Sequence, residues 1–257
     1  MGSVTYRDGI AILQLIVFPF IFAASLFIWK KTGWRVGSRI WRYPATLSLI
    51  RIAGSICTLL TITNKSRNVI IGAYVCELIG IAPLLLTYIG VLRQIDTEER
   101  IPRRGSNLIA IVTIIGLILG IAGVSEADDN GDYKNNLTMA AMGIFLAVFV
   151  IFVLMTIWLW LQTHYNLRVF QKKLFLAVAI SIPFVLVRVV YSALSDYSDI
   201  SRFQINGSDT VYLCMSVLEE IVAMVVTVGL GTSAVLQKDF VKFGSSEQSS
   251  EPKIDAV

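Results

Sequence analysis

Charged side chains interrupt several long apolar stretches of this chain. Arg51, Glu77 and Arg188 each lie inside a separate stretch, and the pair Glu219 and Glu220 lies inside a fourth. A charge in the hydrocarbon core of a membrane costs roughly 3 kcal/mol even on the mildest insertion scale, so such a residue normally faces the protein interior and has a partner. We therefore expect these residues to mark a functional site.

Two cations and up to three carboxylates at one level would suit acid chemistry in a pocket. Burial disfavours the charged form of a carboxyl group, whereas a neighbouring arginine favours it. A glutamate without a partner in such a layer could stay neutral and act as a general acid. The structural alternative is a set of buried ion pairs that fixes the register of the helices, and the two roles are compatible.

The composition indicates that these residues sit in a membrane. Of the 257 residues, 55% are hydrophobic and 16% are charged, and the mean hydropathy is +0.70, which is too apolar for a soluble domain. Continuous apolar runs favour helices over the alternating strands of a barrel. Seven segments can each supply the ~20 residues of a membrane span, at about residues 10–29, 43–62, 69–92, 107–124, 139–161, 174–194 and 210–236.

The predicted fold is therefore all-α, a polytopic bundle of seven transmembrane helices over residues 1–237. Residues 238–257 are polar and are expected to form a disordered tail. Lysine and arginine orient the bundle, because 15 of them fall on the side of the C-terminus and 5 on the other side. This bias predicts an outer or lumenal N-terminus and a cytosolic C-terminus.

Three glycosylation sequons agree with this orientation. They begin at Asn64, Asn136 and Asn206, and all fall on the predicted outer side. The first segment is longer than a typical signal core and is followed by a cationic cluster, so it is expected to be retained as an anchor. We expect a multi-pass protein of the endoplasmic reticulum or another endomembrane rather than of the plasma membrane. Its cationic face suits anionic lipid headgroups, and nothing indicates a nucleic acid partner.

This topology places the charges in one layer. At ~1.5 Å of rise per residue they lie roughly 9 to 16 Å below the outer ends of their segments. Small and polar residues share a helical face with each charge, as Ser48 and Ser55 do with Arg51, and Tyr191 does with Arg188. Such stripes indicate contact between helices, so the charges should point inward. At least one Arg–Glu pair is expected among Arg51, Arg188, Glu77 and Glu220, and Glu219 ranks second because it is turned roughly 100° from Glu220.

Other residues carry weaker signals. The run Asp128-Asp129-Asn130-Gly131-Asp132 spells an aspartate-rich metal motif of prenyl diphosphate chemistry, but it lies in a short outer loop and is expected to be solvated. His164 is the only histidine, and no nucleophile or metal-ligand set can be assembled around it. Cys57, Cys76 and Cys214 are interpreted as small packing residues. No metal and no cofactor are predicted.

Several stretches together resemble a fungal family of heptahelical membrane proteins. They are Tyr6-Arg7-Asp8-Gly9-Ile10, Ser48-Leu49-Ile50-Arg51-Ile52, Gly80-Ile81-Ala82-Pro83-Leu84-Leu85, and Ile182-Pro183-Phe184-Val185-Leu186-Val187-Arg188-Val189-Val190-Tyr191-Ser192, followed by Glu219-Glu220. That family is similar to the membrane-bound terpene cyclases of ascofuranone- and macrophorin-type meroterpenoid biosynthesis. The resemblance covers nearly the whole chain.

The resemblance implies a terpene cyclase of fungal secondary metabolism. Its reaction would be the proton-initiated cyclisation of a prenyl chain, through an olefin or an epoxide, on a hydrophobic prenylated substrate. Such an enzyme needs a buried acid, a dry cavity and aromatic faces for the developing cation, and it works without a metal. The residue analysis offers either Glu77 or Glu220 as the acid and either Arg51 or Arg188 as the group that holds the partner carboxylate or a substrate oxygen. With Tyr191 these are the expected catalytic residues, and substrate contacts are expected from Tyr74, Phe184, Tyr88 and Glu219.

A binding protein is the main alternative. In a receptor-like or lipid-translocating heptahelical protein, the same polar layer would hold a ligand or a lipid headgroup. A retinal protein is disfavoured because the seventh segment contains no lysine for a Schiff base. Neighbouring genes for a polyketide synthase, a prenyltransferase and an epoxidising monooxygenase would favour the cyclase.

Overall fold

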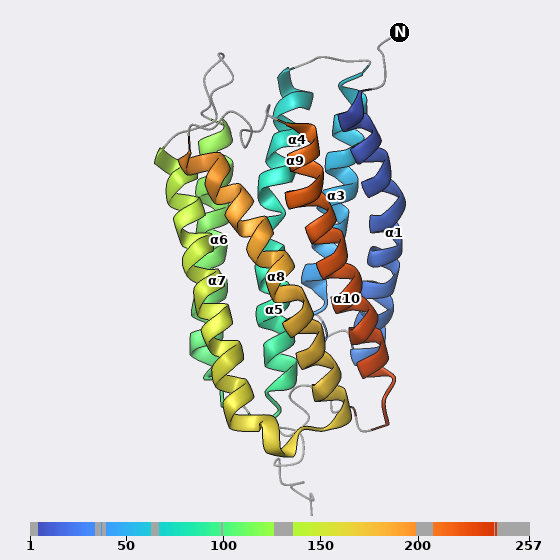
Figure 1. Cartoon of the computed structure of the whole chain (residues 1–257), viewed down its shortest axis with the longest axis vertical. Helices are drawn as coiled ribbons and strands as arrows, with labels where there is room; N and C mark the ends of the chain where they lie inside the picture. Colours follow the sequence, from blue (N-terminus) through green and yellow to red (C-terminus); the bar gives the residue numbers. More distant parts are fainter. Residues whose placement is uncertain are drawn as a thin grey trace, which may run out of the picture.

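The structure is a computed structural model that describes residues 5–33, 37, 40–62, 67–98, 100–125, 136–198, 208–238 and 240. Within these residues, seven helices are long and apolar enough to cross a membrane. They run side by side along one axis (Figure 1). The predicted all-α bundle of seven spanning helices is thus confirmed.

Each span corresponds to one of the apolar segments of the sequence. The first two spans are α1 (Tyr6–Thr32) and α3 (Arg42–Leu60), and the third combines α4 (Arg67–Ile79) with α5 (Ile81–Ile95). The fourth to sixth are α6 (Arg103–Ser125), α7 (Asn136–Thr163) and α8 (Val169–Tyr197), with a short 3-10 turn, His164–Asn166, before α8. The seventh consists of α9 (Asp209–Tyr212), a π-helical segment (Leu213–Val217) and α10 (Leu218–Val235).

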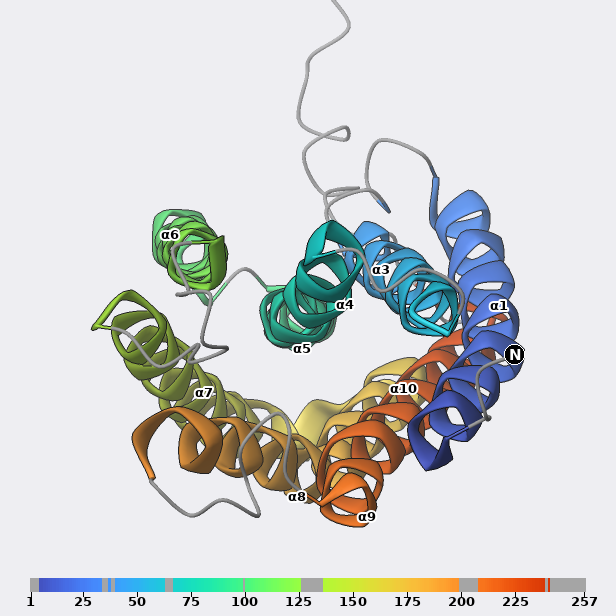
Figure 2. The same ribbon diagram turned by 90° about the horizontal axis from the view of Figure 1, so that it is seen from above.

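Helix α5 forms the centre of the bundle. Every residue of α5 except Arg93 is buried, as expected for a helix that is apolar on all sides. It contacts α3, α6, α7 and α8, and the view along the bundle shows it between α6 and α3, facing α8 (Figure 2). The remaining helices pack in pairs, α1 with α3, α6 with α7 and α8 with α10, and α10 also contacts α1.

The outer helices expose apolar side chains. Ile16 and Phe20 of α1, Leu108 and Ile118 of α6, and Leu154 of α7 are all exposed. In water such a surface would be unfavourable, whereas a lipid bilayer is as apolar as these side chains. The exposed faces therefore support an integral, multi-pass membrane protein.

The third span is broken near its middle. Helix α4 ends at Ile79, and α5 begins at Ile81 after Gly80. Pro83 contributes to this break, because it has no backbone N–H to donate to the carbonyl of Ile79. The helix resumes with a bond from the backbone N of Leu84 to the carbonyl of Gly80, at 3.3 Å. The last turn of α4 thus needs partners for its carbonyl groups from elsewhere.

Several predicted features fall outside the described residues. They are Asn64, Asn206, the acidic run 128–132 and the tail beyond residue 240. Asn136 is described and is the exposed first residue of α7. Its glycosylation, the orientation of the bundle and the retention of the first segment stay predictions.

Candidate functional site

A two-point ion pair joins the second and seventh spans. Nε of Arg51 donates to Oε1 of Glu220 at 2.5 Å, and Nη2 of Arg51 donates to Oε2 of the same carboxylate. Both residues are buried, with 4% and 1% of their surface exposed. This geometry matches the planar fork of a guanidinium to the two oxygens of a carboxylate, which is the strongest form of a protein ion pair.

Arg188 of α8 adds a second cation to the same carboxylate. Its Nε lies 3.6 Å from Oε2 of Glu220, and its Nη1 donates to Oγ of Ser192 at 2.5 Å. Its Nη2 donates to the backbone carbonyl of Glu77 at 3.4 Å. Glu220 therefore lies between two guanidinium groups and connects three of the spanning helices.

Both arginines lie at the break in the third span. The carbonyl of Glu77 belongs to the last turn of α4, where helix carbonyls lack intrahelical donors and carry partial negative charge. Arg188 supplies a donor to that carbonyl. Arg51 passes over Gly80, where an added Cβ would lie 2.5 Å from its Nη2. The glycine thus leaves the space that the guanidinium occupies.

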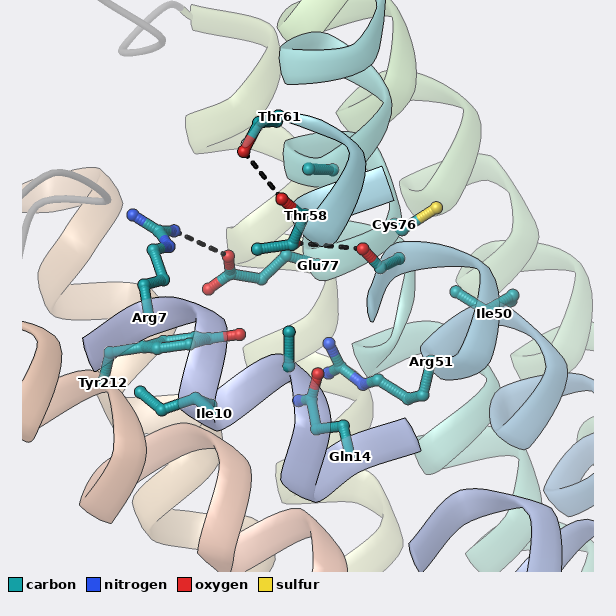
Figure 3. A pocket seen from close by; sticks show the side chains of 13 residues that line it. Arg7, Ile10, Gln14, Ile50, Arg51, Thr58, Thr61, Cys76, Glu77 and Tyr212 are labelled. Atoms are coloured by element: carbon teal, nitrogen blue, oxygen red, sulfur yellow. Dashed lines mark hydrogen bonds and ion pairs between the residues drawn. The ribbon is translucent and has the colours of Figure 1, made fainter. Parts of the chain in front are cut away.

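A pocket of about 290 Å³ lies beside this ion pair, towards the end of the bundle where α1 begins. Its polar wall includes Arg7, Gln14, Arg51, Glu77 and Tyr212 (Figure 3). The rest of the wall is formed by Ile10, Ala11, Ile50, Gly54, Thr58, Thr61, Ala73 and Cys76. The lining of the cavity therefore combines charged and polar groups with apolar side chains.

Glu77 faces this pocket with a partner that the sequence analysis did not assign. Nη2 of Arg7, in the first turn of α1, lies 3.5 Å from Oε2 of Glu77. The side chains remain 26% and 17% exposed, so this ion pair is looser and wetter than the pair of Arg51 and Glu220. The guanidinium of Arg7 also lies over the ring of Tyr212, 5.4 Å from its centroid, within the range of a cation–π contact.

The π-helical segment places Tyr212 in the pocket. In a regular helix at roughly 100° per residue, Tyr212 and Glu220 would differ by roughly 80° about the axis. The wider turn of Leu213–Val217 accommodates one extra residue, which reduces the difference to roughly 20°. Tyr212 therefore lines the pocket on the face from which Glu220 reaches Arg51.

Some of the predicted site residues come together and others do not. Arg51, Arg188 and Glu220 form one cluster, so the expected Arg–Glu pair is present, and Glu77 joins it through its backbone. Tyr191 is buried beside it, with its ring 6.5 Å from that of Tyr212.

The other predicted contacts lie elsewhere. Tyr88 is in the core, where its hydroxyl donates to the carbonyl of Ala223 at 3.3 Å and accepts from Thr227 at 3.2 Å. Phe184 packs against the apolar core, and Glu219 is half-buried. None of these three is among the described residues that line the pocket. Tyr74 belongs to α4, but its side chain is not described.

Three residues of the polar wall were not found from the sequence. Arg7 was counted only as a loop charge. It nevertheless precedes the first apolar segment on the predicted outer side, the side nearer to the layer of buried charges. Gln14 is buried and accepts a hydrogen bond from Oγ of Ser55 at 3.0 Å, and a polar residue inside the first apolar segment was the available signal. Tyr212 gave no signal, because the π-helical segment that positions it has no sequence signature.

The fold and the site together define a heptahelical integral membrane protein with a buried ion-pair cluster beside a pocket. Residues 4–238 match a family described as a domain of unknown function (DUF7702), and the chain belongs to that family. Comparison with the curated proteins gives no match, and comparison with the solved structures gives none either.

Proposed function

We propose that the protein binds an amphipathic small molecule in the pocket between α1, α3, α4 and α9, as a receptor-like or lipid-carrying membrane protein would. The observation that carries this proposal is the mixed wall of the pocket. Arg7, Arg51 and Tyr212 offer hydrogen-bond donors, and Ile10 and Ile50 offer apolar surface beside them (Figure 3). Pockets of this kind orient a ligand with a few polar groups and bury its body against apolar side chains.

The charges of the cluster favour a ligand headgroup that is anionic or accepts hydrogen bonds. Among the described residues that line the pocket, Arg7 and Arg51 are cations and Glu77 is an anion. An acidic headgroup entering the pocket would therefore lie beside two guanidinium groups, which can form charge-assisted hydrogen bonds with it.

A binding experiment with a matched pair of ligands tests this proposal. Purified protein in nanodiscs is titrated with a medium-chain fatty acid and with its methyl ester, and the shift of the unfolding temperature is recorded. The acid should stabilise the protein more than the ester, and Arg7→Gln should remove that preference. Arg104→Gln is the control, because Arg104 is exposed at the other end of the bundle. Equal shifts for acid and ester in the unchanged protein would contradict the proposal.

A cyclase is the second candidate, and the position of Glu77 favours it. Among the described residues that line the pocket, Glu77 supplies the carboxyl group. In a proton-initiated cyclisation, Glu77 would first leave Arg7 and take up a proton, and it would then protonate an olefin or epoxide, with the ring of Tyr212 facing the developing cation in place of Arg7. Glu220 suits this role less well, because both of its oxygens accept hydrogen bonds from Arg51 and it does not line the pocket.

Product analysis separates the two candidates. A fungal host that expresses the protein is fed the prenylated or epoxidised precursor made by neighbouring genes, and cyclised product is measured. General acid catalysis contributes typically ~10²- to 10⁴-fold, so Glu77→Gln should lose ring formation by that factor at unchanged expression. A protein that converts no such precursor is a binding protein instead.

We also propose an endomembrane location with the pocket on the lumenal side, which the basic residues of the opposite end favour.

A further inference from the structure

A second pocket lies at the opposite end of the bundle. It has a volume of about 300 Å³ and is enclosed by the start of α3, the end of α5 and the start of α6. Its polar lining consists of Arg42, Tyr43, Arg93, Ser106 and Asn107. Neither the charged layer nor the proposed ligand pocket includes any of these residues.

Two arginines from different helices border this pocket, and each donates a hydrogen bond to a neighbouring side chain. Nη2 of Arg42 donates to the hydroxyl of Tyr43 at 3.0 Å, and its guanidinium lies 4.8 Å from the centroid of the Tyr43 ring. Nη1 of Arg93 donates to Oδ1 of Asn107 at 3.4 Å. Guanidinium groups have several donors in a fixed plane, so each can contact an anion while keeping such a bond.

Ser106 is an independent observation that points to a ligand site. It lines the pocket and is only 2% exposed. Within the described part of the chain, its Oγ has no hydrogen-bond partner. Buried hydroxyl groups in proteins are nearly always hydrogen-bonded, and an exception calls for an explanation such as a ligand.

Two of the three helix ends at this pocket favour an anion. α3 begins at Arg42 and α6 begins at Arg103, so the first turns of two long helices border the pocket, whereas the end of α5 brings carbonyl groups of the opposite partial charge. Backbone N–H groups at a helix N-terminus point outward and favour anions, above all phosphate. The arginines, the hydroxyl and the two helix ends thus all favour the same type of ligand.

We propose that this second pocket binds a phosphate group, supplied by the headgroup of an anionic membrane lipid. The pocket lies at the ends of spanning helices, which is the level of lipid headgroups. Leu108 and Ile111, beside Asn107 on α6, are exposed apolar residues over which an acyl chain could lie. The remaining lining of the pocket, from Leu86, Ile89 and Gly90 of α5 and Ala110 of α6, is apolar as well.

The test uses the full-length protein in neutral phosphatidylcholine nanodiscs. Short-chain phosphatidic acid is the probe, diacylglycerol of the same chain length is the control without phosphate, and inorganic phosphate is the control without acyl chains. Affinity is taken from the shift of the unfolding temperature with concentration. Phosphatidic acid should bind and diacylglycerol should not. Competition by inorganic phosphate alone would identify a free anion as a second source of the same group.

Variants locate the binding. Arg42→Gln and Arg93→Gln should each lower the affinity for phosphatidic acid about tenfold or more, as expected for the loss of a charge-assisted hydrogen bond. Ser106→Ala should lower this affinity about fivefold without removing any charge. Arg104→Gln is the matched control, because Arg104 lies in the same helix turn as Ser106 but is exposed and outside the pocket.

Two outcomes would overturn the proposal. One is equal binding of phosphatidic acid and diacylglycerol to the unchanged protein. The other is a loss of affinity in Arg42→Gln and Arg93→Gln that Arg104→Gln reproduces, since that would mean attraction to the whole basic surface. Ser106→Ala keeps the test decisive if an arginine variant fails to fold, because this substitution removes a single oxygen atom.

Discussion

Arg51 and Glu220 lie 169 positions apart in the chain and meet in a two-point ion pair between α3 and the seventh span. The same carboxylate lies 3.6 Å from Nε of Arg188, so one carboxylate forms ion pairs with two guanidinium groups. Loss of the anion and loss of either cation are therefore not equivalent. The first leaves two buried charges without a carboxylate, and the second leaves the carboxylate with one arginine.

This inequality predicts an order of stability. Glu220→Gln should lower the free energy of unfolding most, by about 3 to 5 kcal/mol or more, the usual cost of breaking a buried pair. Arg51→Gln should cost less because Arg188 still contacts Glu220. Thermal unfolding in detergent measures both. Glu77→Gln is the comparison, and it should cost least because its pair with Arg7 is partly exposed. An equal loss in all three variants would argue against the shared carboxylate.

Two tyrosines should separate binding from stability. Tyr212→Leu removes a ring that lines the pocket and lies under Arg7. Ligand affinity should fall at least several-fold, because a cation–π contact and buried ring area are lost. Tyr88→Phe removes a core hydroxyl that bonds to Ala223 and Thr227. It should cost about 1 kcal/mol of stability and leave affinity unchanged. Titration and unfolding of both variants check this, and the reverse pattern would contradict the pocket assignment.

Two glycines of α10 provide a matched pair. A Cβ at Gly231 would overlap the six-membered ring of Trp41, which is fully buried, whereas a Cβ at Gly229 meets nothing within 4 Å. Gly231→Ala should therefore destabilise the bundle by about 1 to 3 kcal/mol, as overpacking does. Gly229→Ala should be neutral or stabilising by up to about 1 kcal/mol, because alanine favours the helix. Similar unfolding temperatures for the two variants would mean that Trp41 moves aside.

The orientation of the bundle is also testable. The bias of lysine and arginine predicts a cytosolic C-terminus. Protease added to sealed microsomes should remove a C-terminal tag, while a lumenal marker protein stays intact. A protected tag would reverse the orientation and place the second pocket, rather than the first, on the lumenal side.

Much of the fold could be predicted because its cause is local in the sequence. Each span is a continuous apolar run, and the bilayer thickness sets its length. The contact of Arg51 with Glu220 could also be predicted in outline, since a topology fixes the depth of a charge and a helical stripe fixes its face. Membrane charges have few alternatives to pairing with one another.

The pocket itself could not be predicted from the same rules. Tyr212 reaches it through an altered helical turn, so regular spacing assigns this side chain to the wrong face. Tyr88 shares a helical stripe with Glu77 but lies about 16 Å farther along the span at 1.5 Å per residue, which separates it from the pocket. Arg7 is at the helix start, where apolar periodicity carries no information about packing.

The close passage of Arg51 over Gly80 limits the order in which this region can change during evolution. A side chain at position 80 would meet Nη2 and Cζ of Arg51, at 2.5 and 2.9 Å, and the guanidinium cannot swing away without leaving Glu220. Any residue other than glycine is therefore accessible at position 80 only after a smaller residue has replaced Arg51, and that replacement in turn depends on Arg188 as the remaining cation. Lineages that keep Arg51 should keep Gly80, whereas lineages that have lost Arg51 are free to vary at both positions.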